Sequence, residues 1–325
     1  MLVDDVAAPV RALDRDAVVY VAGHRGLVGS AIWRHLQDQG FTRLVGRSSS
    51  DLDLRDRDAV MDFFAQTRPE VVFMAAAKVG GIMANATYPA DFLSDNLLIQ
   101  VNVLDAAAAH ATQRLLFLGS SCIYPKFAAQ PIHEDSLLTG ALEPTNDAYA
   151  IAKIAGIMQV QSLRRQHRLH YISAMPTNLY GPGDNFDPAT SHVLPALIRR
   201  IYEAKESGAP SVTNWGSGSP RREFLHVDDL ASACLFLMEH YDDGQTINVG
   251  TGSDVTIKEL AEMVAGIVGY EGEIVWDTTK PDGTPRKLLD VSRLADLGWS
   301  ASIPLEQGLR STYDWYVEHR ADVRG

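Results

Sequence analysis

Cysteine is scarce in this 325-residue sequence, in which Cys122 and Cys234 are the only two. Two cysteines cannot build the disulfide framework of a small secreted domain, and their spacing does not fit a zinc site. Long apolar runs are also absent, since none reaches the ~20 residues that a membrane-spanning helix needs. The chain begins Met1-Leu-Val-Asp-Asp, with acidic residues where a signal peptide carries basic ones. We therefore expect a cytoplasmic protein without a metal site or a membrane partner.

Basic charge is in short supply as well. The sequence has 29 Lys and Arg against 41 Asp and Glu, which gives a net charge of −12. Phosphate backbones require a basic binding surface, so this balance argues against nucleic acid as the main partner. It still permits a phosphorylated small molecule that is held by a few arginines. The length and the hydrophobic content of 46% predict one large or two smaller globular domains.

Predicted strands and helices alternate through the first half of the chain. The strands are expected at 18–22, 44–46, 71–74, 114–118 and 171–175, and the helices at 30–39, 56–66, 89–109 and 147–167. Consecutive parallel strands need a crossover helix between them. The order therefore predicts an α/β protein with a Rossmann-type doubly wound parallel sheet. After residue 180 the alternation weakens, and Pro and Gly become frequent.

A glycine-rich turn joins the first predicted strand to the first predicted helix. It reads Gly23-His24-Arg25-Gly26-Leu27-Val28-Gly29. Such glycines let the backbone approach a pyrophosphate, which then lies on the N-terminus of the helix. The spacing is Gly-x-x-Gly-x-x-Gly instead of Gly-x-Gly-x-x-Gly, and a purely structural turn is the alternative. The strand–turn–helix context favours a dinucleotide.

Arg47 directly follows the second predicted strand, at a place where NAD-binding folds usually carry an acidic residue. An arginine there suits the 2′-phosphate of NADP(H), and Arg25 of the glycine turn could assist it. Two solvated surface arginines are the alternative.

These observations divide the chain into a leader and two domains. We assign 1–17 to a loose leader, 18–180 to an NADP-binding Rossmann domain, and 181–222 with 251–325 to a smaller α/β substrate-binding domain. Residues 223–250 are expected to return to the Rossmann domain as a strand, a helix capped by Asp228 and a further strand. Cys234 would be a buried residue of that helix.

Tyr149 and Lys153 lie four residues apart in a predicted helix, so both side chains occupy one face. An ammonium beside a phenol lowers the pKa of the tyrosine, which suits acid–base work. Ser120 follows a predicted strand at its carboxyl end, where ligands bind in open α/β sheets. These three groups could serve hydride transfer to a carbonyl. The thiol of Cys122, on the same loop, indicates a second proton transfer.

Longer segments in both domains resemble a known family. They are Ala22–Ile32, Ala75–Ile82, Gly119–Lys126, Glu143–Asn146, Tyr149–Gly156, Met175–Pro182, Ser191–Val193, Trp215–Gly218, Arg222–Asp229 and Lys280–Lys287. Together they resemble the extended short-chain dehydrogenase/reductase family from about residue 18 to the C-terminus. Within it, they are most similar to the enzymes that invert C3 and C5 of a GDP-4-keto-6-deoxy-mannose and then reduce its C4.

The resemblance implies a role for each matching residue. Tyr149 would protonate the C4 oxygen as NADPH delivers hydride, Lys153 would bind the nicotinamide ribose, and Ser120 would hydrogen-bond the carbonyl. Cys122 and His192 would be the acid–base pair that inverts C3 and C5. The implied NADP(H)-binding residues are Gly23, His24, Arg25, Gly26, Leu27, Val28, Gly29, Arg47, Asp53, Leu118, Gly119, Ser120, Ser121, Lys153, Pro176, Thr177, Asn178, Leu179 and His192. The implied residues for the GDP-sugar are Arg200, Trp215, Arg222 and Asp282.

Plainer interpretations remain open for several of these residues. His192 could be a surface or capping residue at a helix start, Arg222 a strand-edge charge and Trp215 a core aromatic. Lys126 is left without a role. Where some members of the family carry a second arginine after the second strand, this chain has Ser49, which weakens the case for a strong NADP preference.

Two other functions are compatible with this fold. The first is another nucleotide-sugar enzyme, such as a 4-epimerase or a 4,6-dehydratase. A 4-epimerase needs no acid–base thiol, and dehydratases usually carry an acidic pair where this chain has Ser121 and Cys122. The second is a cofactor-sensing regulator, which typically lacks the Tyr or the Lys. The resemblance also implies a homodimer, formed by helices 89–109 and 147–167 of each copy.

Overall fold

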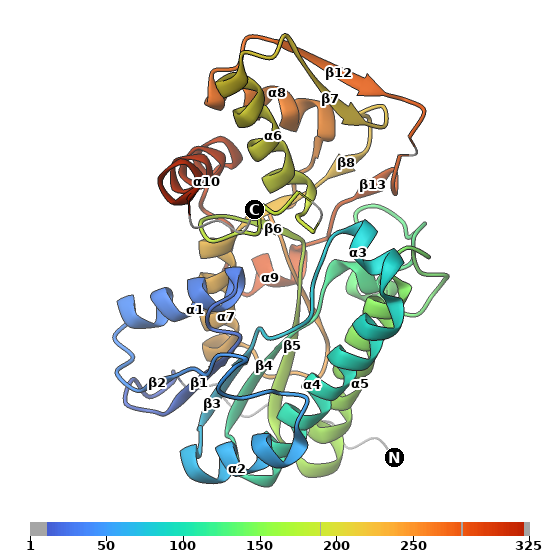
Figure 1. Ribbon diagram of the computed structural model, residues 1–325. Helices are drawn as coiled ribbons and strands as arrows, with labels where there is room; N and C mark the ends of the chain where they lie inside the picture. Colours follow the sequence, from blue (N-terminus) through green and yellow to red (C-terminus); the bar gives the residue numbers. More distant parts are fainter. Residues whose placement is uncertain (1–11, 189, 281, 322–325) are drawn as a thin grey trace.

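The computed structural model describes residues 12–188, 190–280 and 282–321. Its centre is a six-stranded parallel sheet with the order β10-β5-β4-β3-β1-β2 (Figure 1). The strands are β1 (Val19–Ala22), β2 (Leu44–Val45), β3 (Val71–Met74), β4 (Arg114–Leu118), β5 (His170–Pro176) and β10 (Ile247–Val249). Every neighbouring pair in this sheet is parallel. The predicted doubly wound parallel sheet is confirmed.

Helices cover both faces of this sheet, because successive residues of a strand point to opposite sides. Val19 and Val21 of β1 pack in one core cluster with α1 (Leu27–Asp38) and α7 (Val227–His240). Tyr20 and Ala22 pack in a second cluster on the opposite face. The helices on that face are α2 (Arg57–Thr67), α4 (Pro89–Ala109) and α5 (Asp147–His167).

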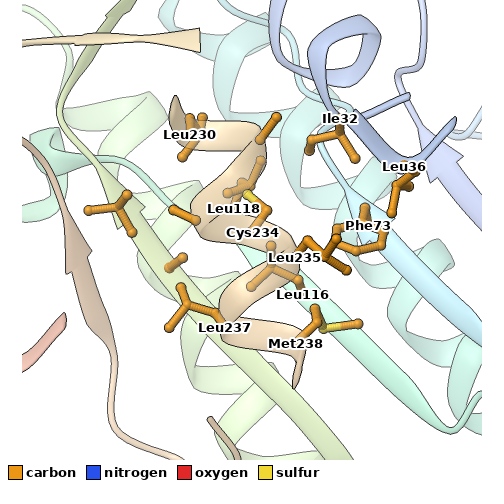
Figure 2. Packing of buried hydrophobic residues seen from close by; sticks show 14 of the residues in the cluster. Ile32, Leu36, Phe73, Leu116, Leu118, Leu230, Cys234, Leu235, Leu237 and Met238 are labelled. Atoms are coloured by element: carbon orange, nitrogen blue, oxygen red, sulfur yellow. The ribbon is translucent and has the colours of Figure 1, made fainter. Parts of the chain in front are cut away.

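Helix α7 returns from the second half of the chain and lies on the first face of the sheet. Figure 2 shows leucines of α7 in one apolar layer with side chains from α1, β3 and β4, and Leu235 lies near Phe73 of β3. Cys234 is fully buried in the same layer, as the sequence predicts. The predicted cap was wrong: the His226 side chain, and not Asp228, accepts the free N–H at the start of α7.

The predicted leader is only partly described, since residues 1–11 lie outside the described part of the chain. Residues 12–17 are not loose. Leu13 and Ala17 are buried in the first core cluster, and Arg15 forms an ion pair with Glu239 of α7. These residues are held because the sheet face beside α7 offers them an apolar surface.

A second lobe lies beyond the carboxyl end of β5 and has its own core (Figure 1). Its helices are α6 (Val193–Ser207), α8 (Ile257–Val268) and α10 (Leu305–His319). Its strands are β6 (Asn178–Tyr180) with β9 (Phe224–His226), β7 (Ser211–Trp215) with β12 (Glu273–Asp277), and β8 (Arg221–Arg222) between β11 (Val255–Thr256) and β13 (Arg286–Lys287). Short elements complete the described chain: α3 (Ile82–Thr87), η1 (Ser121–Ile123), η2 (Glu134–Ser136) and α9 (Ser292–Asp296).

The segment from residue 288 to 301 differs from its predicted assignment to the smaller domain. Leu294 of α9 and Trp299 belong to the core cluster of the first lobe, and Leu289 belongs to the cluster on the opposite face of the sheet. The segment follows β10 because these apolar side chains find buried neighbours there. In the described residues, no helix has the length and apolar character needed to cross a membrane.

The strand order of the sheet reverses at β1, because β2 lies on one side of β1 and β3 lies on the other. A ligand crevice is expected outside the carboxyl ends of the strands at such a switch point. Gly23 follows β1 with a φ of +82°, and a Cβ there would lie 2.9 Å from the Cα of Ala76, just after β3. The two strand ends therefore meet closely at this crevice.

Helices α4 and α5 pack closely through Gly156. A Cβ at this position would lie 2.4 Å from Cζ of the fully buried Phe117 and 2.8 Å from Oε1 of Gln100. We expect Gly156→Ala to destabilise the protein by ~1–3 kcal/mol, because overpacking a filled core forces side chains to shift. Gly266 in α8 has nothing within 4 Å of its Cβ position, so Gly266→Ala is the matched control and should stabilise by ~1 kcal/mol. Opposite shifts in melting temperature would confirm this; equal shifts would contradict it.

Candidate active site

Tyr149 and Lys153 lie on one face of α5, as predicted. The Nζ atom of Lys153 is 5.8 Å from the centre of the Tyr149 ring. It donates a hydrogen bond of 2.8 Å to the carbonyl oxygen of Leu118, the last residue of β4. It also lies 4.9 Å from the centre of the Phe117 ring. The amine is therefore fixed between helix α5 and the carboxyl end of β4.

The structure corrects the predicted ionisation of this pair. Burial raises the pKa of Tyr149, and the charge of Cys122 raises it further. Burial also lowers the pKa of Lys153 to about 8. The sequence predicts a lowered pKa for the phenol, because residue spacing reveals the neighbouring amine. Spacing does not reveal that burial removes water from around both groups. At neutral pH the phenol therefore keeps its proton.

Ser120 and Cys122 are joined by a hydrogen bond at the carboxyl end of β4. The thiol donates to Ser120 Oγ over 2.9 Å, and the backbone N–H of Cys122 also points at this oxygen, at 3.4 Å. Ser120 begins the short turn η1, where Cys122 is buried and only 8% exposed. Negative charge on Cys122 would raise the pKa of both Tyr149 and Lys153, so the thiol, phenol and amine share one region.

His192 lies at the start of α6 in the second lobe. Its side chain makes no capping hydrogen bond, and the residue is exposed. Protein atoms around the ring displace water and lower the pKa of the imidazole. The preceding loop is fixed to the first lobe, because Gly81 N donates to Thr190 O over 3.1 Å. No hydrogen bond joins His192 to Cys122 or Tyr149 in the described residues.

The glycine turn fits the pyrophosphate of a dinucleotide. A Cβ on Gly29 would lie 2.1 Å from the carbonyl oxygen of Gly23, so no other residue permits this close turn. Helix α1 starts directly after Gly26, and no side chain caps its free N–H groups. It begins three residues earlier than predicted, at Leu27. Uncapped N–H groups at a helix N-terminus favour a phosphate.

Arg25 and Arg47 both lie beside this turn and are exposed. The pKa of His24 is lowered mainly by burial of its ring and further by the charges of both arginines. The pKa of Asp51 is lowered mainly by hydrogen bonds from Ser48 and further by the same two charges. They therefore act on the same short loop. The Nδ1 atom of His24 is buried without a hydrogen-bond partner in the described residues. The two arginines and the unpaired His24 nitrogen therefore form a positively charged edge of the glycine turn, which suits a 2′-phosphate.

The remaining residues expected to bind the cofactor have different surroundings. Asp53 is exposed and forms an ion pair of 2.8 Å with Arg55, so its carboxylate is already paired. Gly119 N donates to Ala174 O over 2.9 Å, which ties the end of β4 to β5. The others line the ends of β4 and β5: they are Leu118, Ser121, Pro176, Thr177, Asn178 and Leu179.

The backbone of Glu223 orients the side chain of Asn178. Its side-chain amide donates to the carbonyl oxygen of Glu223 over 2.8 Å, and Thr177 Oγ1 donates to the same oxygen over 3.4 Å. The Glu223 carboxylate is fully buried and accepts N–H groups of Thr251 and Leu289. This glutamate, which the sequence does not single out, therefore fixes the segment after β5.

The four residues expected to hold a GDP-sugar all lie in the second lobe. Arg200 of α6 donates to Asn214 Oδ1 over 2.7 Å. Trp215 ends β7 and is 64% exposed, which excludes the alternative of a core aromatic. Asp282 accepts hydrogen bonds from the backbone and hydroxyl of Ser217, so it fixes the loop after Trp215. Arg222 lies on β8, beside Lys287 of β13.

Two further charged residues near Cys122 are revealed only by the structure. Lys126, left without a role by the sequence, forms an ion pair of 2.9 Å with Glu143. Lys287 lines the same small cavity as Cys122, Lys126 and Glu143. The only sequence signal for Lys287 is its place at the end of the segment Lys280–Lys287. His226 and Asp229 have structural roles: His226 caps α7, and Asp229 accepts the N–H groups of residues 302 and 303.

The chain is similar to known proteins over most of its length. The model of the NAD dependent epimerase/dehydratase family matches residues 19–250. A putative GDP-L-fucose synthase 2 of Arabidopsis thaliana is 63% identical over 307 residues, which cover 94% of each chain. The GDP-L-fucose synthase of Escherichia coli K12 is 56% identical over 316 residues, covering 94% of this chain and 98% of the bacterial one.

A solved structure gives the same picture. The crystal structure of a GDP-L-fucose synthetase from Naegleria fowleri bound to NADP matches with a TM-score of 0.91 at 29% identity, covering 99% of this chain and 100% of that one. The family model spans more than two thirds of the chain, and the relatives match nearly end to end. The chain therefore belongs to the NAD dependent epimerase/dehydratase family, an extended short-chain dehydrogenase/reductase family, as its motifs indicate.

Proposed function

We propose that this chain is a GDP-L-fucose synthase. It would invert C3 and C5 of GDP-4-keto-6-deoxy-D-mannose and reduce C4 with NADPH to form GDP-L-fucose. The observation that carries the proposal is the hydrogen bond between Cys122 and Ser120 next to Tyr149 and Lys153. A reductase alone needs the serine, tyrosine and lysine, whereas the thiol adds a group for moving protons on carbon. The high identity to GDP-L-fucose synthases points the same way.

The epimerase half requires proton transfer at two carbons beside a ketone. The C4 carbonyl acidifies the C–H bonds at C3 and C5, so an enolate can form without a metal. Cys122 and His192 would act on opposite faces of the sugar ring, one removing a proton and the other returning one. As the C–H bond breaks, its electron pair moves to the C4 oxygen, which Ser120 Oγ would stabilise by donating a hydrogen bond.

The reductase half uses the residues around Tyr149. NADPH would supply the hydride to C4. Tyr149 would then donate its phenolic proton to the C4 oxygen, and the raised pKa keeps this proton available at neutral pH. Lys153 remains largely protonated below its pKa of about 8, and its charge would stabilise the phenolate that forms. Its hydrogen bond to Leu118 O holds it in this position.

Both ligands have a place in the proposal. The turn from Gly23 to Gly29 would hold the cofactor pyrophosphate, with Arg25 and Arg47 on the 2′-phosphate. The second lobe would bind the GDP moiety through Arg200, Trp215 and Arg222, which we assign from the sequence to the substrate-binding domain. Asp282 would act through the loop after Trp215, because its carboxylate is bonded to Ser217.

The reaction of the wild-type protein in deuterated water tests the function. We expect GDP-4-keto-6-deoxy-D-mannose and NADPH to give GDP-L-fucose with deuterium at C3 and C5, measured by mass spectrometry and NMR. NADPH oxidation without deuterium would leave a simple 4-reductase. In a parallel reaction with GDP-mannose, whose C4 carries a hydroxyl, inversion at C4 without net change in the cofactor would indicate a 4-epimerase, and loss of water to a 4-keto-6-deoxy sugar would indicate a 4,6-dehydratase. NADPH binding with no turnover would indicate a cofactor sensor.

The cofactor preference should depend on the two arginines at the glycine turn. We expect the double substitution Arg25→Ser and Arg47→Ser to weaken NADPH binding by ~30-fold, since charge-assisted hydrogen bonds to the 2′-phosphate are lost. NADH binding should change less than threefold. Arg43→Ser is the control, because Arg43 is exposed just before the start of β2. Fluorescence titration measures both cofactors; equal losses for NADPH and NADH would contradict the assignment.

The same proposal includes a homodimer in the cytoplasm. Leu98 of α4 and Ile151 and Met158 of α5 are 47%, 46% and 40% exposed on two helices that pack side by side. Ile151 and Met158 are seven residues apart and share one face, which a second copy could cover. Equilibrium sedimentation should give twice the chain mass of 35.6 kDa. Ile151→Glu with Met158→Glu should give the monomer. A monomeric wild type would remove the dimer.

A further inference from the structure

Lys287 is a positively charged residue of the second lobe. Together with Arg222 it lies on the side of that lobe that is next to Cys122. It lies on β13, where the parallel register places it directly beside Arg222 of β8. Register partners in a parallel sheet point to the same face, so the two positive side chains are neighbours. Lys287 also lines one small cavity with Cys122, Lys126 and Glu143, at the boundary between the two lobes. Residues of both lobes therefore line this cavity.

The other charges around this cavity already have partners. Lys126 is paired with Glu143 at 2.9 Å, and Glu143 also accepts a hydrogen bond of 3.3 Å from Thr284. Arg222 donates to the carbonyl oxygen of Arg221. The Lys287 amine makes neither a hydrogen bond nor an ion pair in the described part of the chain. Lys287 is half-buried, and a partly desolvated ammonium without a partner is costly, so this position calls for an anion.

Cys122 is the group that can supply this anion from the chain itself. Burial lowers the pKa of Lys287, negative charge on Cys122 raises it, and Arg222 lowers it while Glu143 raises it. Such an interaction is reciprocal: if a charged sulfur favours the ammonium, the ammonium favours the charged sulfur by the same free energy. The hydroxyl of Ser120 is a neutral neighbour and cannot replace this charge.

We propose that Lys287 is a positioning residue for the epimerase half of the reaction: its ammonium faces Cys122 from the second lobe and stabilises the thiolate that takes a proton from the substrate. The proposal rests on the proposed function only for the identity of the substrate. Negative charge on Cys122 raises the pKa of both Lys153 and Lys287, so Lys287 adds a cation from the second lobe to the one that α5 already places near the sulfur.

The rate of thiol alkylation tests the proposal without any turnover. Iodoacetamide reacts with the thiolate, and the fully buried Cys234 should not react. At pH 7.5 we expect Lys287→Met and Lys287→Gln to slow alkylation of Cys122 about tenfold, as for a one-unit change in thiolate ionisation. Lys287→Arg should stay within threefold of the wild type. Lys258→Met removes an exposed lysine of α8 and is the control. Cys122→Ser gives the background.

A second measurement separates this role from binding of a diphosphate. Lys287→Met should slow deuterium exchange into the substrate about tenfold, with GDP affinity within threefold of the wild type. Unchanged alkylation together with a tenfold loss of GDP affinity would make Lys287 a phosphate ligand and overturn the proposal. Unchanged alkylation with unchanged affinity would also overturn it. Failure of the wild type to exchange deuterium would remove the proposed function instead, while the alkylation result stands by itself.

Discussion

Replacement of Cys122 by serine is expected to reduce deuterium incorporation at C3 and C5 by ~10³-fold while NADPH-dependent reduction continues. A positioned acid–base group typically contributes 10²–10⁴-fold to a proton transfer. A serine hydroxyl keeps the size and the hydrogen bond to Ser120, but it does not ionise near neutral pH. The product should therefore be the 4-reduced sugar with its C3 and C5 unchanged. NMR of the product in deuterated water measures both outcomes.

The second cysteine provides the control for this experiment. Cys234 is fully buried on α7, on the face of the sheet opposite to α5. Cys234→Ala should lower the melting temperature slightly by removing a buried sulfur, but it should leave deuterium exchange within twofold of the wild type. Full exchange in Cys122→Ser would assign the proton transfer to another group. Loss of reduction and exchange together would mean that the thiol serves the whole site.

Replacement of Tyr149 by phenylalanine is expected to give the opposite split. Reduction should fall by ~10³-fold, because the C4 oxygen loses its proton donor, while deuterium exchange at C3 and C5 continues. Tyr171→Phe is the control, since Tyr171 is buried near the amino end of β5 and donates to Thr112 O. It should keep reduction within threefold of the wild type. Retained reduction in Tyr149→Phe would make another group the acid.

The pH dependence of reduction follows from the same pair. Burial lowers the pKa of Lys153 to about 8, so its charge is present below this pH and is lost above it. Burial raises the pKa of Tyr149, so the phenol does not lose its proton first. Reduction should therefore decline as the pH rises through about 8. Lys153→Met should lower the rate at pH 7 and remove this decline, as measured by the rate of NADPH oxidation. A decline that persists would belong to another group.

Long regular elements could be predicted from the sequence because their pattern is local. Helices α4 and α5 have the bounds that the sequence predicts, 89–109 and 147–167, since each carries an apolar pattern over many turns. The strands of the second lobe could not be predicted in this way. Strands β8, β11 and β13 have two residues each, and they exist only because residues 221–222 pair with 255–256 and 286–287.

The residues that we propose to react could be chosen from the sequence, since Tyr149, Lys153, Ser120 and Cys122 lie close together along the chain or in one motif. Their charge states did not follow. The pKa of a phenol or an amine depends on how much water remains around it, and that is decided by segments far away in the sequence. Lys287 is 165 positions from Cys122, and only the packing of the second lobe on the first places both beside one cavity.

The sequence by itself determined the class of fold, the glycine turn for a dinucleotide and the residues proposed for the chemistry, because these depend on local spacing and on residue type. The tertiary structure decided which protons those residues hold, which of their charges are already paired, and which residue of the second lobe faces the thiol. The physical reason is burial. A side chain loses its surrounding water only when distant parts of the chain pack together, and the spacing of residues along the sequence does not show which parts will do so.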